Sequence, residues 1–139
     1  MFPKWHILLG IIFSILLYIL FKITLFQTLL VFLSSVLIDI DHYLFFVKRK
    51  KEFSLKKAFN WHKKLVGKQH KPIMHVFHTI EFVTLILILS FFWDIFVFVL
   101  IGILFHSIID IIDMFYNKWY GLREFSLIRY LLKDKKNYF

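Results

Sequence analysis

Cysteine is absent from this 139-residue chain, so neither a disulfide nor a thiolate metal ligand can form. Any metal ion must therefore be held by nitrogen and oxygen atoms. The first apolar stretch also lacks a small-residue cleavage site, and it continues with little interruption into more apolar sequence. We therefore expect this stretch to remain as a membrane anchor.

Apolar residues dominate the composition. Hydrophobic residues make up 60% of the chain and aromatic residues 21%, with a mean hydropathy of +0.72. One soluble core of this size could not bury so much apolar surface, so the surplus should face lipid. Four apolar stretches approach the ~20 residues that a bilayer span needs: residues 5–21, 24–47, 73–92 and 95–115. The sequence therefore predicts an all-α fold, a single membrane-embedded bundle of four transmembrane helices covering residues 1–139.

Two further segments have an amphipathic helical pattern. In residues 54–67, apolar side chains repeat at helical spacing, with Ser54 placed as an N-cap and Gly67 as a C-terminal stop. This pattern predicts a short helix that lies on the inner leaflet of the membrane. A weaker pattern over residues 121–133 predicts a second interfacial helix.

Basic residues are distributed very unevenly. Of the 18 lysines and arginines, ten lie within residues 48–71 and six within residues 118–136, whereas the two opposite turns carry only Lys22 and Asp94. The positive-inside bias therefore places the 48–72 loop and both termini in the cytoplasm, in a multi-pass protein of the cell membrane. The net charge of +9 also suits nucleic acid, but loop lysines beside membrane helices more often contact anionic headgroups. Membrane lipids are therefore the expected partners, and nucleic acid is disfavoured.

Nine titratable groups lie within the apolar stretches and are candidate metal ligands. They are Asp39, Asp41 and His42 in the second stretch, His75, His78 and Glu81 in the third, and His106, Asp110 and Asp113 in the fourth. In a helix, the spacing of the last three places them on one stripe. The rise per residue puts all three groups in the same cytoplasmic half of the membrane. This coincidence of depth predicts one shared site.

Charge balance indicates what would occupy that site. Each acidic group near the bilayer centre costs about 2.5–3.5 kcal/mol, and no lysine or arginine lies within the last three stretches. One to three divalent cations would compensate, and mixed histidine and carboxylate ligands suit Zn²⁺ best, with Mn²⁺ or Fe²⁺ as alternatives. The preferred ligands are Asp39, His42, His78, His106 and Asp110. The expected roles of Asp41, Glu81 and Asp113 are to bridge metals, orient a ligand histidine or act as the catalytic base.

A simpler interpretation applies to each histidine alone. An isolated intramembrane histidine more often forms a hydrogen bond to a neighbouring helix than binds a metal. Only the convergence of nine groups favours a metal site over that interpretation. We expect His6 and His62 to be headgroup-level or packing residues, and the role of His70, within the lysine-rich segment, is open.

Two short motifs resemble a known family. Asp39-Ile40-Asp41-His42, and Gly102 with His106 and Asp110, resemble the motifs of the membrane-bound metal-dependent hydrolases, also called LexA-binding, inner-membrane-associated hydrolases. The family's middle motif matches either His70 with His75, or His78-Thr79 in the company of Glu81. The resemblance implies a membrane hydrolase and covers roughly residues 37–113.

A more distant resemblance concerns chemistry. The spacing of His106 and Asp110 is similar to that in zinc-dependent phospholipases C and related zinc nucleases. By that resemblance the site would be a multinuclear centre that hydrolyses phosphoesters.

These observations together predict a membrane hydrolase that uses metal-activated water on a phosphoester of a lipid or lipid-linked substrate. One alternative is a non-catalytic membrane adaptor, with a structural metal and a cytoplasmic loop that binds a protein partner. The other is a metal or ion transporter, which is less favoured because the outer halves of the helices offer no polar path.

Overall fold

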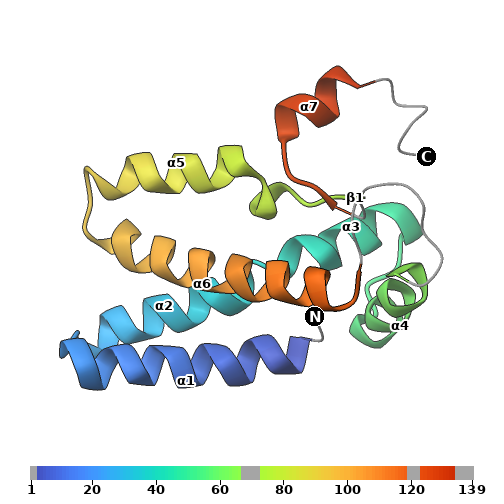
Figure 1. Cartoon of the computed structure of the whole chain (residues 1–139). Helices are drawn as coiled ribbons and strands as arrows, with labels where there is room; N and C mark the ends of the chain where they lie inside the picture. Colours follow the sequence, from blue (N-terminus) through green and yellow to red (C-terminus); the bar gives the residue numbers. More distant parts are fainter. Residues whose placement is uncertain (1–2, 67–72, 119–122, 134–139) are drawn as a thin grey trace.

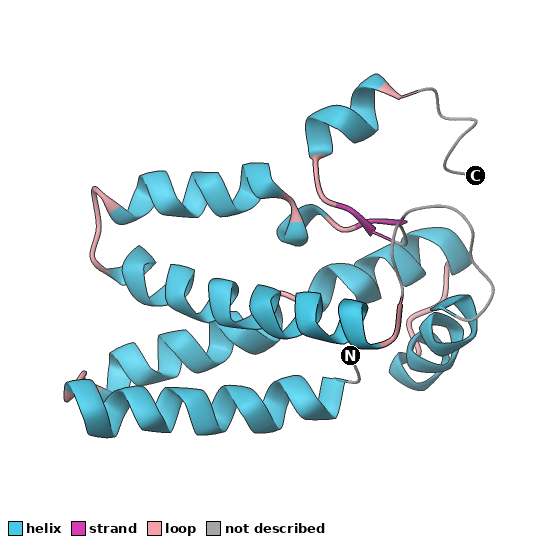
Figure 2. Ribbon diagram, viewed as in Figure 1, coloured by secondary structure: helices cyan, strands magenta, loops and turns pink. Residues whose placement is uncertain are grey.

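The computed structural model describes residues 3–66, 73–118 and 123–133. Its helices pack lengthwise, with successive long helices running in opposite directions (Figure 1). The helices are α1 (Pro3–Phe21), α2 (Leu25–Leu37), α3 (Ile40–Lys50), α4 (Leu55–Val66), α5 (Ile80–Ser90), α6 (Ile95–Tyr116) and α7 (Leu127–Leu132). Figure 2 shows how little of the described chain is strand: β1 (Ile73–Met74) and β2 (Arg123–Glu124) form one short parallel pair. The all-α prediction is confirmed.

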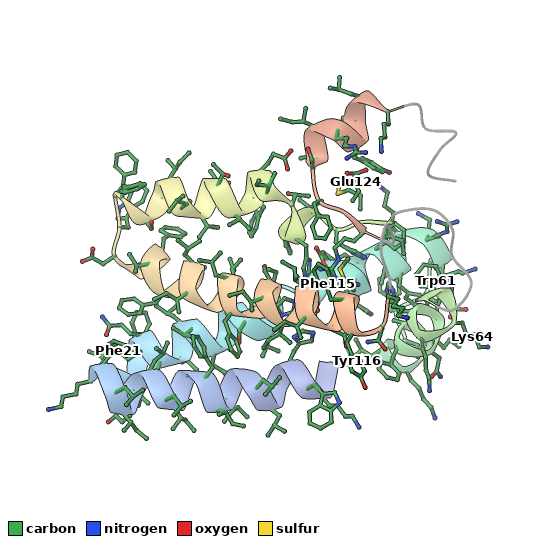
Figure 3. All side chains as sticks on the ribbon, viewed as in Figure 1. Phe21, Trp61, Lys64, Phe115, Tyr116 and Glu124 are labelled. Atoms are coloured by element: carbon green, nitrogen blue, oxygen red, sulfur yellow. The ribbon has the colours of Figure 1, made fainter. Side chains whose placement is uncertain are left out.

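Three helical stretches are long and apolar enough to cross a membrane: Lys4–Phe21, Leu25–Lys50 and Ile95–Tyr116. Large apolar side chains cover their outer surface, and Leu20, Phe21 and Ile112 are all more than half exposed. Such a surface is stable against lipid and unstable in water. The chain is therefore consistent with a membrane protein. Figure 3 shows these side chains, with Phe21 at one end of the bundle and Trp61 and Lys64 of α4 at the other.

The predicted third span, residues 73–92, is only partly helical. Helix α5 has 11 residues, about 16 Å of helix, which is less than the ~30 Å hydrocarbon core. Residues 73–79 instead form β1 and the 3₁₀ turn η1 (Val76–His78). Helix α5 begins late because the hydroxyl of Thr79 caps it, accepting a hydrogen bond from the Phe82 N–H. The prediction of a continuous helix here was wrong, and among the described residues there are three candidate spans where four were predicted.

The predicted second span contains a turn at Ile38 and Asp39, which separates helices α2 and α3. In this turn the Asp39 N–H donates to the Val36 carbonyl. Both turn residues keep right-handed helical backbone angles, so Leu25–Lys50 remains one apolar stretch. Asp41 is buried and Asp39 is about three-quarters buried.

Small residues let α2 pack closely against two neighbours. A Cβ atom on Gly102 of α6 would clash with the Val31 carbonyl and the Ser34 hydroxyl of α2. A Cβ atom on Gly10 of α1 would likewise come too close to the hydroxyl of Ser35 in α2. Close backbone approach of this kind is a common basis of helix association in membranes. It brings the following turn of α6, which carries His106, against the backbone of α2.

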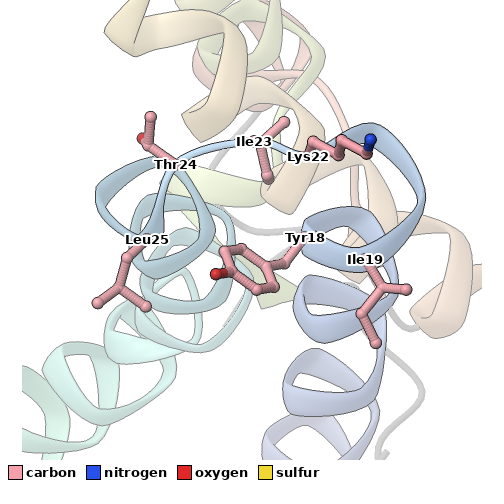
Figure 4. A pocket seen from close by; sticks show the side chains of 6 residues that line it. All are labelled: Tyr18, Ile19, Lys22, Ile23, Thr24 and Leu25. Carbon is pink, nitrogen blue, oxygen red and sulfur yellow. The ribbon is translucent and has the colours of Figure 1, made fainter.

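At the far end of the bundle, the turn between α1 and α2 leaves a small hollow (Figure 4). A capping box, in which Thr24 and Gln27 each accept a backbone hydrogen bond from the other, fixes the start of α2 beside it. The lining contains no histidine or carboxylate: it consists of Tyr18, Ile19, Lys22, Ile23, Thr24 and Leu25. The hollow therefore lacks the groups that metal chemistry needs.

The close packing of α6 on α2 predicts the relative effect of two glycine substitutions. Gly102→Ala should lower stability by about 1–3 kcal/mol, because its Cβ meets backbone as well as side chain. Gly10→Ala should cost less, since its Cβ meets only the end of a serine side chain. Thermal unfolding of the two variants in detergent measures the difference. Equal melting temperatures would show that α2 and α6 do not pack this closely.

Candidate metal centre

Eight histidines and aspartates converge in the bundle. They form four overlapping groups, and within each group the possible ligand atoms all lie within 4.8 Å of one another. The members come from α1, the α2–α3 junction, the segment from β1 to η1, and α6: His6, Asp39, Asp41, His42, His75, His78, His106 and Asp110. The buried histidine and aspartate groups could therefore hold a metal ion.

Two carboxylate oxygens of this cluster each lie close to the same pair of histidine nitrogens. The Nε2 atoms of His78 and His106 lie 3.2 Å apart. Asp39 Oδ1 lies 3.6 and 3.4 Å from these two nitrogens, and Asp110 Oδ2 lies 3.8 and 3.4 Å from them. Metal–ligand bonds of about 2.0–2.1 Å place the ligands of a tetrahedral ion roughly 3.3–3.4 Å apart. The separations among His78, His106 and Asp110 are close to that value and could suit an ion with two imidazole ligands and one carboxylate ligand, whereas Asp39 and Asp110 share no group.

Hydrogen bonds on the other side of each ring orient these two histidines. His106 Nδ1 lies 2.7 Å from the Ser35 carbonyl oxygen, and His78 Nδ1 lies 3.1 Å from Asp41 Oδ2. Both oxygens can only accept, so each Nδ1 carries the proton, and in a neutral ring Nε2 then presents a lone pair. Two lone pairs thus face each other beside two carboxylate oxygens. Either an added proton or a cation must lie among these atoms, and the hydrogen bonds are those typical of metal-binding histidines.

A second position adjoins the first. Asp41 Oδ1 and His75 Nδ1 are 3.7 Å apart and, within the part of the chain that the structure describes, neither has a hydrogen-bond partner. Both side chains are more than nine-tenths buried. A buried polar atom without a partner costs about 1–3 kcal/mol. His42 belongs to a group with these two residues and to another with Asp39 and His78, so it lies between the two positions.

His6 is part of the cluster, which corrects the prediction that it is a headgroup-level or packing residue. Its Nε2 lies 3.1 Å from Asp110 Oδ1, and its ring stacks on that of His106 with centroids 4.1 Å apart. Only 3% of the residue is exposed. Gly10 and Ser14 follow His6 at offsets of four and eight, and all three are buried, so this stripe was the sequence signal for its place.

Arg123 is the second residue that the sequence did not indicate. Its Nη1 donates to Asp110 Oδ2 over 2.7 Å, so a guanidinium contributes to the charge balance that the sequence assigned to metal ions alone. The strand pair brings it there, because Arg123 in β2 lies opposite Ile73 in β1, just before His75. Two-residue strands leave no readable periodicity in a sequence.

Glu81 does not belong to any of the four groups, although it was a predicted ligand or base. Its carboxylate accepts hydrogen bonds from the Ser126 hydroxyl at 2.6 Å and from the Leu127 and Ile128 N–H groups at 3.0 and 3.2 Å. The negative charge thus lies at the N-terminus of α7, where the helix dipole stabilises it. The geometry gives Glu81 a structural role in place of the predicted metal or catalytic one.

Asp113 also lies outside the four groups. Its Oδ1 accepts a hydrogen bond from Asn117 Nδ2 at 3.1 Å, one turn further along α6. The helical stripe that includes His106 and Asp110 is real, but its last member lies beyond the level of the cluster. The predicted ligand or base role of Asp113 therefore finds no support in the geometry.

The remaining histidines differ in their positions. His62 of α4 donates through Nε2 to the His42 carbonyl at 2.8 Å, and burial lowers the pKa of its ring, so the ring is neutral near pH 7. This contact agrees with a packing role beside the cluster. Both His75 and His78 lie in the cluster, whereas His70 is outside the described residues.

Comparisons of the chain with protein-family models, curated proteins and solved structures found no match. The functional conclusion therefore depends on the residues of the cluster and their geometry.

The geometry predicts which substitutions release metal. His106→Ala and Asp110→Asn should lose bound metal and unfold at lower temperature in detergent, because each removes a ligand of the His78, His106 and Asp110 group and leaves carboxylates uncompensated. His6→Ala should weaken binding as well. His62→Ala and Glu81→Gln are the matched controls outside the four groups, and both should keep their metal.

Elemental analysis of the purified variants, reported as metal per chain, measures this effect. The same metal content in His106→Ala and His62→Ala would exclude the cluster as the binding site.

Proposed function

We propose that this chain is a membrane-bound, metal-dependent hydrolase that cleaves a phosphoester of a lipid or lipid-linked substrate. One observation supports it most strongly: two oriented imidazole nitrogens lie 3.2 Å apart, with carboxylate oxygens of Asp39 and Asp110 within 3.8 Å of them, inside an apolar bundle. The resemblance of the short motifs around Asp39 and His106 to those of membrane metal-dependent hydrolases agrees with this proposal.

The residues divide between two ion positions. His78, His106 and Asp110 would hold the first ion, with Asp39 beside them, and Asp41, His42 and His75 would hold the second. Zn²⁺ suits these nitrogen and oxygen ligands best, with Mn²⁺ or Fe²⁺ as alternatives. A bound divalent cation supplies a Lewis acid and lowers the pKa of a water ligand to about 7.

The protein's own groups orient these ligands. The Ser35 carbonyl holds the His106 ring, and Asp41 holds the His78 ring through one oxygen. The Phe77 N–H donates to the same oxygen of Asp41 at 3.0 Å, which turns the other oxygen toward His75. Asp41 thus links the two positions. In hydrolysis, the oxygen of water adds to phosphorus while the ester oxygen leaves and takes up a proton.

The exposure of the cluster supports one place of entry for a substrate. The side chains of Asp39 and His42 are 23% and 28% exposed, whereas those of His78 and Asp110 are 2% and 5% exposed. The cluster is therefore most open at the α2–α3 junction. Ile40 and Leu44, both about half exposed, lie beside this opening. An apolar rim next to a polar centre suits a molecule with an acyl or prenyl tail and a phosphate headgroup.

The proposed orientation places this end of the bundle in the cytoplasm. Helix α4 carries four lysines and lies at the end where α1 begins and α6 ends (Figure 1). Lysines at this level would contact anionic headgroups of the inner leaflet, with α4 on its surface.

Topology reporters test this orientation. A reporter fused after Phe139 and another inserted at Gly67 should both report cytoplasm, because the lysine distribution favours that side. A reporter in the turn around Lys22 should report the opposite side. Opposite results for Phe139 and Gly67 would contradict the arrangement.

Catalysis is tested with the purified protein in lipid nanodiscs. It should hydrolyse a lipid-like phosphoester, lose activity on chelation and regain it with Zn²⁺ or Mn²⁺, and the rate should fall below about pH 7. Asp41→Asn should lower the rate at least about 100-fold, because both ion positions depend on this carboxylate. His62→Ala should keep most of the activity.

A negative result is equally informative. A fully metallated sample without turnover on phospholipids, lipid-linked pyrophosphates and acyl esters would favour the alternative, in which the metal is structural and the chain is a membrane adaptor.

A further inference from the structure

Arg123 is held firmly beside the metal cluster. Strand β2 pairs in parallel with β1, which aligns Arg123 with Ile73 and Glu124 with Met74. His75 follows β1 directly, and His78 lies in the next turn. The strand that pairs with Arg123 therefore also leads into these two histidines. A second backbone contact, from the Ile80 N–H to the Phe125 carbonyl at 2.8 Å, extends the same connection. The guanidinium is therefore positioned by the element that builds the site.

Arg123 makes a single side-chain contact in the described part of the chain. Nη1 donates to Asp110 Oδ2, while 15% of the side chain remains exposed. A guanidinium has five N–H donors in a planar fork, so four of them are available to another acceptor.

The charges of the cluster favour an anionic ligand. Asp39, Asp41 and Asp110 contribute three negative charges and Arg123 one positive charge. One divalent cation makes this set neutral, and a second leaves two positive charges in a site that is largely buried. An anion that binds both the metal ions and the guanidinium would remove this excess.

We propose that Arg123 and the metal cluster together form a binding site for the phosphate group of the substrate. This inference rests on the proposed function and adds to it the residue that distinguishes a phosphoester from an uncharged acyl ester. The guanidinium fork matches two phosphate oxygens, whereas the single carbonyl oxygen of an acyl ester can use only part of it. Arg123 would hold the phosphate against the ions while keeping its contact with Asp110.

The neighbouring basic side chains provide a matched control. Arg129 Nε and Lys133 Nζ lie 3.9 and 3.3 Å from the carboxylate of Glu124. The Arg129 side chain is 66% exposed, so its replacement should change the local charge without changing the cluster. Arg129→Gln therefore separates a specific effect of Arg123 from a general loss of positive charge.

The test uses the full-length, metal-loaded chain in phosphatidylcholine nanodiscs, with inorganic phosphate as the probe and calorimetry as the readout. Wild type and Arg129→Gln should bind phosphate with the same affinity. Arg123→Gln should bind it at least tenfold more weakly with unchanged metal content. Equal affinity in Arg123→Gln would overturn the inference and leave Arg123 as a structural partner of Asp110.

Two further comparisons keep the test decisive. If Arg123→Gln loses metal, the variant Arg123→Lys is tested in its place. Phosphate binding about tenfold weaker than in wild type would then support the role of the guanidinium fork, and unchanged binding would contradict it. If phosphatidic acid in the nanodisc competes with inorganic phosphate, a lipid headgroup is the source of the phosphate. If it does not compete, the source is a water-soluble phosphoester. Metal without phosphate binding in wild type would refute this inference alone, whereas absence of metal would refute the proposed function too.

Discussion

The hydrogen bond from His106 Nδ1 to the Ser35 carbonyl is the contact on which the candidate metal centre most depends. It fixes the protonated nitrogen of the ring and directs the other nitrogen at Asp39, His78 and Asp110. The bond can form only because Gly102, one turn earlier on α6, lets the two backbones approach. A backbone packing constraint thus determines the chemistry available to a side chain.

Three irregular features bring the other ligands to the same place. The turn between α2 and α3 carries Asp39, the 3₁₀ turn η1 presents His78, and the β1–β2 pair positions Arg123. The turn, η1 and β1 each interrupt an apolar segment that was predicted to be a continuous helix. Broken helices are tolerated in membranes where side chains satisfy the freed backbone groups and where the break lines a polar site.

The sequence predicted the parts of this site that depend on helical spacing and depth. His106 and Asp110 share a stripe of a regular helix, and the common depth of three segments indicated one cluster. His6 was missed because its stripe with Gly10 and Ser14 was not recognised in an otherwise apolar helix. Arg123 was missed because it follows the apolar segments and reaches the cluster through a two-residue strand. Depth alone did not show which neighbour the Glu81 carboxylate faces, and that neighbour is the N-terminus of α7. The late start of α5 was partly readable, since Thr79 is typical of the residue that caps a helix.

The central claim is that a divalent cation, and not a proton, lies among the four facing atoms. X-ray absorption spectroscopy of the purified chain tests it most directly, because the spectrum identifies the metal and its ligands together. We expect nitrogen and oxygen ligands at about 2.0–2.1 Å, with the outer-shell scattering of at least two imidazole rings. A metal-free protein, or a spectrum without imidazole scattering, would contradict the claim.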